Sequence, residues 1–255
     1  MRPIVFAVLF YSWTTLAGIM VLPLLPGPPR YLLAYSRFWI RVSLWLLRVT
    51  VGLSHEVRGQ ENIPDGPALF AIKHQSAWDT LAINLIIHDA AIVLKRELTW
   101  IPIFGWCLVR ARQVPIDRGG GLSVLRNMVT AAQARVAEGR PVVIFPEGTR
   151  VPPGTHVPYH AGISALNNAL DIPVVPVALN SGLFWPRRSL ALRPGRITIE
   201  FLPQLPDVSS RKEFVQSLET AIENSTSRLI AEAIDRYDLP PLHVPVDKVV
   251  EERQA

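Results

Sequence analysis

A histidine and an aspartate stand five residues apart where a predicted buried strand gives way to polar residues. In the segment Ala68–Asp79, the apolar run ends just before His74, and Asp79 follows five positions later. Five residues span about 140° around a continuous helix, so the two side chains cannot pair on one helical face. With His74 in the strand-to-helix turn and Asp79 in the first helical turn, the carboxylate reaches back to the imidazole. The aspartate then fixes the tautomer while the histidine removes a proton from a hydroxyl. The alternative is an aspartate that only caps the helix and an unrelated exposed histidine.

A second apolar strand segment also ends in a compact polar turn. Val142–Arg150 has the sequence VVIFPEGTR. Gly148 lets the backbone approach a ligand, Arg150 offers a fork of donors suited to phosphate, and Glu147 can accept from a hydroxyl. A β-turn with an incidental ion pair is the alternative. Two polar clusters at strand ends favour a ligand site, because open α/β sheets bind ligands beyond the carboxyl ends of their strands.

The region around these two segments is locally basic. Residues 91–150 contain nine Lys or Arg against four Asp or Glu, whereas residues 200–255 contain six against eleven. A basic middle fits a phosphorylated substrate or coenzyme, although the sequence has no GxxxxGK[ST] or GxGxxG phosphate loop. Four apolar residues of this region fit equally well as the wall of an acyl groove or as core: Trp100, Ile101, Phe104 and Trp106.

The composition of the 255 residues excludes several classes of protein. Hydrophobic residues make up 49% and charged residues 18%, which excludes long disorder. The single cysteine, Cys107, excludes an internal disulfide and a multi-cysteine metal site. Residues 1–53 contain five arginines and no acidic residue, so they carry the whole formal charge of +5. The remaining 21 basic and 21 acidic residues balance, which argues against nucleic acid as a partner.

Residues 1–53 have the pattern of a membrane-anchoring element. Ile4–Leu22 is a 19-residue apolar run, about 28 Å long as a helix, enough to just cross a hydrocarbon core. The four arginines of residues 30–53 are separated by 7, 4 and 7 residues. They fall on a stripe about 40° wide, which suits a helix lying in the headgroup plane. Because the basic residues follow the apolar run, the positive-inside tendency places the rest of the chain in the cytoplasm. The alternatives are a cleaved signal peptide, for which no good cleavage site follows, and a helix packed on the domain.

Alternating strand and helix patterns after residue 53 predict an α/β fold. We expect a mixed, largely parallel sheet flanked by helices and preceded by the membrane-associated two-helix element. The predicted domains are membrane-anchoring helices at 1–53, an α/β domain at 54–238 and a C-terminal tail at 239–255. The predicted strands are His55–Arg58, Ala68–Ile72, Ala91–Leu94, Gln113–Ile116, Val142–Phe145, Val174–Leu179 and Ile197–Phe201. The predicted helices are Thr80–Ile87, Leu122–Glu138, Gly162–Ala169 and Arg211–Arg236.

Four ordered motifs of this chain resemble those of the glycerophospholipid acyltransferases, specifically the bacterial 1-acylglycerol-3-phosphate acyltransferases. They are His74-Gln-Ser-Ala-Trp-Asp79, Ile116-Asp-Arg118, Phe145-Pro-Glu-Gly-Thr-Arg150 and Val174-Val-Pro-Val-Ala-Leu-Asn-Ser181. Their order and spacing agree with the family, and the resemblance covers residues 55–205. It implies transfer of a fatty acyl group from a coenzyme A or acyl-carrier-protein thioester to the sn-2 hydroxyl of lysophosphatidate. This is a step of phospholipid biosynthesis, expected at the cytoplasmic side of the bacterial inner membrane.

The resemblance also implies roles for individual residues. His74 is expected to be the general base and Asp79 its orienting partner. Binding of the glycerol or the reacting carbonyl is expected from Glu147, Gly148 and Thr149, binding of the phosphate from Lys95, Arg118 and Arg150, and an acyl-binding wall from Pro176. The resemblance implies no metal, no bound cofactor and no covalent acyl-enzyme. Acyl-CoA or acyl carrier protein is the co-substrate, and the further partners are membrane lipid and the lysophospholipid.

One position departs from the family pattern and keeps other acceptors open. His160 stands where the family usually has a lysine, and a neutral imidazole would weaken a phosphate contact there. One alternative is therefore O-acylation of another lysolipid, such as a lyso-aminolipid. A second alternative is a covalent path through a Ser76 nucleophile. The non-enzymatic alternative is a membrane adaptor that docks through residues 30–53.

Overall fold

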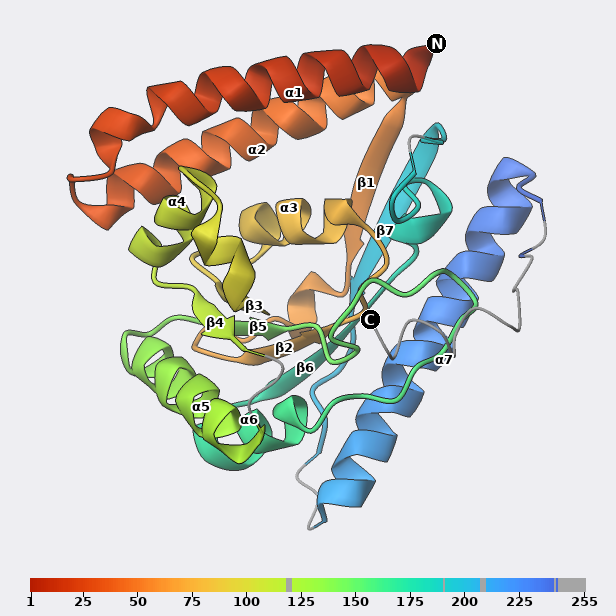
Figure 1. Ribbon diagram of the computed structural model, residues 1–255. Helices are drawn as coiled ribbons and strands as arrows, with labels where there is room; N and C mark the ends of the chain where they lie inside the picture. Colours follow the sequence, from red (N-terminus) through yellow and green to blue (C-terminus); the bar gives the residue numbers. More distant parts are fainter. Residues whose placement is uncertain (118–120, 190, 207–209, 241, 243–255) are drawn as a thin grey trace.

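A seven-stranded sheet forms the centre of the protein in the computed structural model, which describes residues 1–117, 121–189, 191–206, 210–240 and 242 (Figure 1). The strand order is β1-β7-β6-β2-β5-β3-β4. All neighbouring strands run parallel except β6 and β7, so the predicted mixed, largely parallel sheet is confirmed. The strands are β1 (Leu53–Arg58), β2 (Leu69–Ile72), β3 (Ala91–Lys95), β4 (Val114–Ile116), β5 (Val142–Ile144), β6 (Val174–Leu179) and β7 (Gly195–Phe201).

Helices cover both faces of this sheet and bury two separate apolar clusters. One cluster contains residues of α2, α3 and the C-terminal half of α7, and the other contains residues of α5, α6 and the N-terminal half of α7. Helix α7 therefore contributes to both clusters. The α-helices are α1 (Arg2–Met20), α2 (Pro29–Val51), α3 (Ala77–Ile86), α4 (Phe104–Arg110), α5 (Gly121–Ala137), α6 (Gly162–Leu170) and α7 (Arg211–Tyr237). The short 3-10 helices are η1 (Leu22–Leu24), η2 (Gln60–Asn62), η3 (Arg96–Trp100) and η4 (Ser181–Leu183).

The central strand β2 shows how the two clusters are separated. Successive side chains of a strand point to opposite faces of the sheet. Phe70 and Ile72 belong to the cluster under α2 and α3, whereas Leu69 and Ala71 belong to the cluster under α5 and α6. At the carboxyl end of β2, successive side chains therefore point to opposite faces of the sheet.

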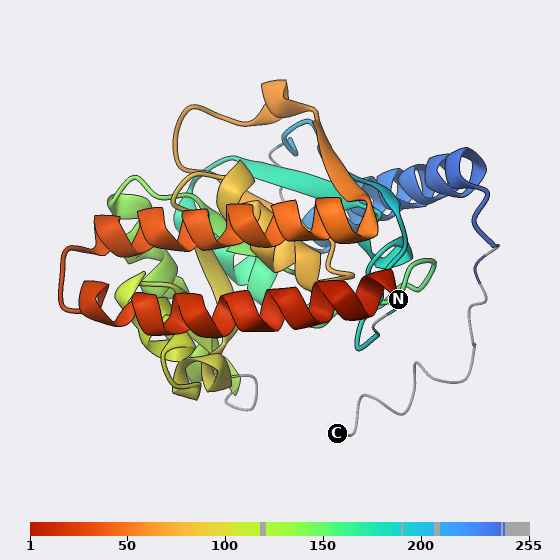
Figure 2. The same ribbon diagram turned by 90° about the horizontal axis from the view of Figure 1, so that it is seen from above.

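Helices α1 and α2 form an antiparallel hairpin that lies across one end of the molecule (Figures 1 and 2). The indole of Trp13 donates to the carbonyl of Trp39 at 3.2 Å, and the Tyr35 hydroxyl donates to the carbonyl of Ala17 at 2.9 Å. Gly52, with φ of +80°, ends α2 in the left-handed conformation and turns the chain into β1. The hairpin is therefore fastened to the α/β domain through a tight turn and through packing of α2.

Two local features differ from the prediction. Helix α3 begins at Ala77, before the predicted start at Thr80, because Ser76 caps it. Helix α4 and the preceding η3 were not predicted, since Pro and Gly interrupt any helical pattern there. The four apolar residues of this segment are not core: Trp100, Ile101, Phe104 and Trp106 are all exposed.

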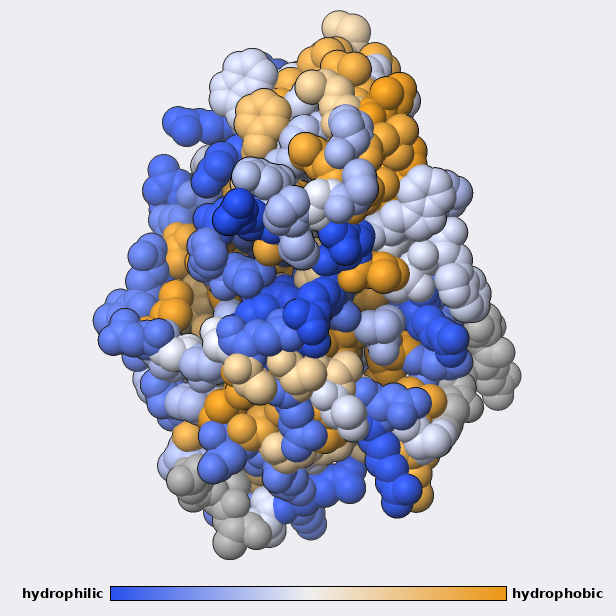
Figure 3. All heavy atoms as spheres, turned by 90° about the vertical axis from the view of Figure 1, so that its left-hand side faces the viewer, coloured by the Kyte–Doolittle hydropathy of each residue, from blue (hydrophilic) through white to orange (hydrophobic). Residues whose placement is uncertain are grey.

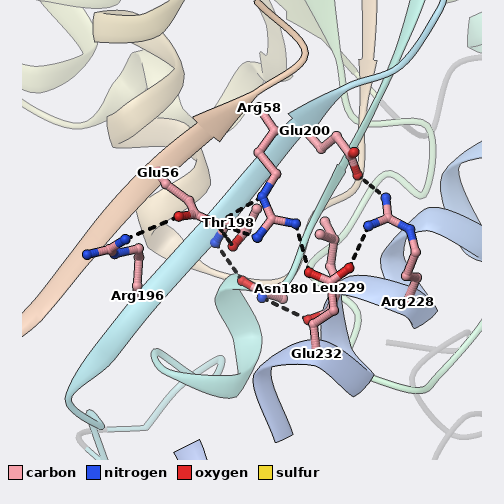
Figure 4. A network of polar contacts seen from close by, with 9 residues as sticks. All are labelled: Glu56, Arg58, Asn180, Arg196, Thr198, Glu200, Arg228, Leu229 and Glu232. Carbon is pink, nitrogen blue, oxygen red and sulfur yellow. Dashed lines mark hydrogen bonds and ion pairs between the residues drawn. The ribbon is translucent and has the colours of Figure 1, made fainter. Parts of the chain in front are cut away.

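A polar network ties the end of β6 and the strands β7 and β1 to helix α7 (Figure 4). The buried Asn180 accepts from the backbone amide of Thr198 at 2.9 Å and donates to the carbonyl of Leu229 at 3.1 Å. Around it, exposed arginine–glutamate pairs such as Arg58 with Glu232 at 2.7 Å add little stability. The buried amide is the stronger tie, and it holds the chain at the end of β6, where η4 begins.

Candidate active site

The turn between β2 and α3 brings together the histidine and the aspartate singled out by the sequence. Ser76 is the N-cap of α3, and its hydroxyl accepts from the amide of Trp78 at 3.1 Å. Asp79, three residues later, accepts from the backbone amide of Ser76 at 2.8 Å. This reciprocal pair is a capping box, which fixes the first turn of the helix. It holds the Asp79 carboxylate over the chain that leads into the helix.

The same carboxylate contacts the imidazole. Asp79 Oδ2 lies 2.9 Å from His74 Nδ1 and accepts from the amide of Gln75 at 2.7 Å. Its other oxygen, Oδ1, accepts from the hydroxyl of Ser181 at 2.5 Å. Asp79 is buried, so these contacts leave its carboxylate no rotational freedom. The aspartate therefore caps the helix and contacts the histidine at once, so the alternative of an unrelated, exposed histidine is wrong.

The surroundings of His74 suit a general base. With a carboxylate against Nδ1, that nitrogen carries the proton, and Nε2 is left to accept one. The ring stacks on Phe145 with centroids 4.1 Å apart, and 13% of the side chain is exposed. Its backbone is held on both sides, because the amide donates to Glu147 Oε2 at 2.8 Å and the carbonyl accepts from Val151 at 2.8 Å. A hydroxyl that reaches Nε2 meets a base with a fixed direction.

Glu147 lies behind the histidine. It is buried, and its second oxygen, Oε1, lies 2.6 Å from Lys73 Nζ. Burial raises the pKa of Glu147 to about 7, although the neighbouring Lys73 lowers it. The next residue, Gly148, has a φ of +66°, and a Cβ there would lie 2.6 Å from the ring of His160. The turn after β5 thus requires glycine, both for its conformation and for the close approach of His160.

Cationic side chains gather at the same edge. Arg150 is half-buried, and burial lowers its pKa. The charges of Arg187 and Arg188 also lower the pKa of Arg150, whereas the charge of Asp79 raises it. Arg187 also donates to the carbonyl of Arg150 at 3.3 Å. Lys95 stands exposed at the carboxyl end of β3, which β5 separates from β2. The edge where His74 lies therefore carries positive charge suited to a phosphate.

The remaining predicted site residues lie in different places. Thr149 is exposed in the turn after β5. Pro176 is buried within β6, in register with Ala71 of β2, so it contributes to the sheet beneath the site. Arg118 lies outside the described residues. Within the ranges that the structure describes, no three His, Cys, Asp or Glu side chains come together as metal ligands.

Sequence reasoning gave no role to several residues that the structure places in the site. Ser181 is the last residue of the fourth motif, and its hydroxyl donates to Asp79. Lys73 places a charge directly after a wholly apolar strand, and this is a signal that the sequence offers. Glu223 and Tyr159 gave none, because the contacts of Glu223 with Lys73 and with Tyr159 join distant parts of the chain.

The comparisons with known proteins agree with this geometry. The sequence model of the Acyltransferase family matches residues 54–180. A 1-acyl-sn-glycerol-3-phosphate acyltransferase of Pseudomonas aeruginosa is 35% identical over 222 residues, which cover 87% of this chain and 86% of that protein. This chain belongs to the acyltransferase family. The predicted family is thus confirmed, and the chemistry expected of the His74–Asp79 pair is acyl transfer.

More distant matches were found by sequence and by structure. A coconut (Cocos nucifera) 1-acyl-sn-glycerol-3-phosphate acyltransferase is 28% identical over 193 residues, covering 74% of this chain and 61% of that protein. The crystal structure of the 1-acyl-sn-glycerophosphate acyltransferase PlsC from Thermotoga maritima superposes with a TM-score of 0.74. The superposition covers 91% of this chain and 98% of the other at 22% sequence identity, which supports the fold.

Proposed function

We propose that this acyltransferase moves a fatty acyl group from a coenzyme A or acyl-carrier-protein thioester to the sn-2 hydroxyl of lysophosphatidate, giving phosphatidate. The observation that carries the proposal is the His74–Asp79 contact of 2.9 Å at a cationic sheet edge. The Pseudomonas relative, named for this activity, supports the choice of acceptor.

The reaction follows from the direction of the imidazole. His74 Nε2 removes the proton from the lipid hydroxyl as its oxygen attacks the thioester carbonyl. The C–O bond forms, the C–S bond breaks, and the thiolate takes the proton back from the imidazolium. Asp79 stabilises the imidazolium between these steps. No metal, bound cofactor or acyl-enzyme takes part in this scheme.

A covalent path through Ser76 has little support. The Ser76 side chain is completely buried, and its hydroxyl caps α3. A nucleophile must reach the thioester, and this oxygen would have to leave the cap to do so. Direct attack by the lipid hydroxyl needs no such movement.

The phosphate of the acceptor is assigned to Arg118, Arg150 and Lys95. The half-buried Arg150 supports this role, because a phosphate would relieve the repulsion that it feels from Arg187 and Arg188. We assign Gly148 and Thr149 to the glycerol or the reacting carbonyl, and Pro176 to the acyl-binding wall. Glu147 is assigned to the backbone of His74, because both its oxygens are already engaged.

The acceptor is tested by thiol release from acyl-CoA and acyl carrier protein across a panel of lysolipids. The proposal expects release with lysophosphatidate that the His74→Ala variant abolishes. A second candidate, a lyso-aminolipid acceptor, is favoured only by His160. This histidine stands where the family usually has a lysine, and it packs against Gly148. Release with a lyso-aminolipid but not with lysophosphatidate would establish that candidate instead. No release above the His74→Ala control with any acceptor would refute acyl transfer to lysolipids.

We further propose that residues 1–53 anchor the enzyme to the cytoplasmic side of the bacterial inner membrane, with 54–238 as the catalytic domain and 239–255 as a tail. Among the described residues, one helical segment, Arg2–Leu24, is long and apolar enough to cross a membrane, and only 17% of its most apolar window is buried. Apolar side chains gather at the hairpin end of the surface (Figure 3). Because α1 lies along α2 across the domain, insertion into one leaflet is favoured over a perpendicular span.

The segment η3–α4 extends this apolar surface. Ile103 lies against Gly18 of α1, and Arg110 donates to the carbonyl of Gly27 in the hairpin turn at 2.5 Å. Trp100 is 68% exposed and Val109 is 61% exposed, so their side chains are available to lipid. Of the arginine stripe on α2, Arg37 is half-buried, whereas the other three are exposed. Co-flotation with anionic vesicles tests this arrangement, and failure to float would overturn it.

A further inference from the structure

Lys73 is a buried charge that the acyl-transfer scheme does not use. It directly precedes His74, and only 1% of its side chain is exposed. Its amino group lies 2.6 Å from Glu147 Oε1 and donates to both oxygens of Glu223 on α7, at 2.7 and 2.9 Å. A lysine charge is costly to bury unless it is paired, so these contacts must hold tightly for it to be retained.

The two glutamates lead from Lys73 to opposite ends of a chain of contacts. Glu147 accepts from the backbone amide of His74 at 2.8 Å. Glu223 accepts from the Tyr159 hydroxyl at 2.9 Å. Burial raises the pKa of Tyr159 far above its ordinary value, as does the adjacent Glu223, so the phenol stays protonated and donates. A continuous series of contacts therefore joins helix α7 to the backbone of His74.

We propose that Lys73 is a positioning residue for acyl transfer, which holds Glu147 against the His74 amide and anchors both to α7 through Glu223. The inference rests on the proposed role of His74 as general base. We call Lys73, Glu147, Glu223 and Tyr159 the lysine network. Without the Lys73 amino group, Glu147 loses the contact that holds Oε1 in place, and its carboxyl group is free to turn away from the His74 amide. The His74 backbone then loses the contact that, with Val151, sets the direction of Nε2.

The variants Lys73→Met and Glu223→Gln test this network from its centre and from its outer end. Because a small misplacement of a catalytic group costs about a hundredfold in rate, Lys73→Met is expected to lower kcat by about 30- to 100-fold. KM for both substrates should change by less than about threefold, because Lys73 touches neither of them. Glu223→Gln should lower kcat by about tenfold, and the double variant should be no slower than Lys73→Met, since both act through one network.

A matched control is available on the same helix. Glu219 lies one turn before Glu223, is 25% exposed against 20%, and contacts His156 at 2.6 Å instead of Lys73. Glu219→Gln should leave kcat unchanged. If Lys73→Met and Glu223→Gln retain wild-type kcat per folded molecule, or if Glu219→Gln is equally slow, the proposal is wrong. Should Lys73→Met fail to fold, Glu223→Gln and Tyr159→Phe decide the matter by the same criteria.

A second measurement separates this inference from the proposed function. Diethylpyrocarbonate modifies imidazole nitrogens, and peptide mass spectrometry follows the rate at His74 without any substrate. The rate should rise in Glu223→Gln, because the His74 backbone is loosened, and should not change in Glu219→Gln. An unchanged rate in both variants would overturn the positioning role. If the wild type releases no thiol with lysophosphatidate, the proposed function fails, and this modification rate still tests the lysine network.

Discussion

The variant Asp79→Asn separates the charge of the orienting carboxylate from its hydrogen bonds. An amide oxygen in the place of Oδ2 still accepts from His74 Nδ1 and from the amides of Gln75 and Ser76. The amide nitrogen then replaces Oδ1 and donates to Ser181, whose hydroxyl turns to accept. Because the capping contacts survive, we expect the free energy of unfolding to fall by only about 1 kcal/mol.

The catalytic loss should be much larger. When His74 takes the proton, the imidazolium lies 2.9 Å from a full negative charge in the wild type. Two unit charges about 4 Å apart interact by about 4 kcal/mol at an effective dielectric constant of about 20. A neutral amide recovers part of this through its dipole, so we expect the activation barrier to rise by about 3–4 kcal/mol. This corresponds to a kcat lower by about 10²- to 10³-fold.

Thiol release with acyl-CoA and lysophosphatidate measures this loss, and thermal unfolding followed by circular dichroism measures stability. The His74→Ala variant gives the reference activity that remains without a general base. A variant that unfolds like the wild type and keeps kcat within about threefold would refute the orienting role of the carboxylate charge. A variant whose activity falls only in proportion to its folded fraction would show that Asp79 serves the helix cap alone.

Three further predictions test other parts of the molecule. Ser76→Ala should lower the free energy of unfolding by about 1 kcal/mol through loss of the cap, while mass spectrometry finds no trapped ester and turnover stays near wild type. Because burial raises the pKa of Glu147 to about 7, the folded state holds its proton more tightly than the unfolded chain. The stability of the wild type relative to Glu147→Gln should therefore fall by about 2–3 kcal/mol as pH rises from about 4.5 to above 7, measured by urea unfolding across that range; a pH-independent difference contradicts this. With Cys107→Ala as background, a fluorophore on Val109→Cys should shift to shorter wavelength with anionic vesicles and be quenched by brominated lipid. The same label on Leu122→Cys, which is exposed on α5, should not respond; equal responses at both sites would contradict membrane contact through η3–α4.

The sequence allowed the fold class and the central pair of the site to be predicted, because both depend on local patterns. Strands such as Val174–Leu179 were found from their apolar β-branched residues, and His74 with Asp79 from the polar residues at a strand end. The lysine network could not be predicted, since its contact between Lys73 and Glu223 joins residues 150 positions apart. Exposure of Trp100 was also unpredictable, because an aromatic residue suits a core, a groove and a membrane surface equally well.

The spacing of the histidine and the aspartate has a structural explanation in the helix cap. Only a side chain in the first turn can reach back over the N-cap, and at the third helical position Asp79 meets the amide of Ser76. Ser76 at the N-cap is extended, and the same oxygen also meets the amide of Gln75 and the ring of His74. One residue fewer would remove the imidazole from reach, and one more would turn the carboxylate to another face of the helix. The geometry that starts α3 therefore also orients the imidazole of His74, and we expect the stability of this helix terminus and the activity of the enzyme to depend on the same carboxylate.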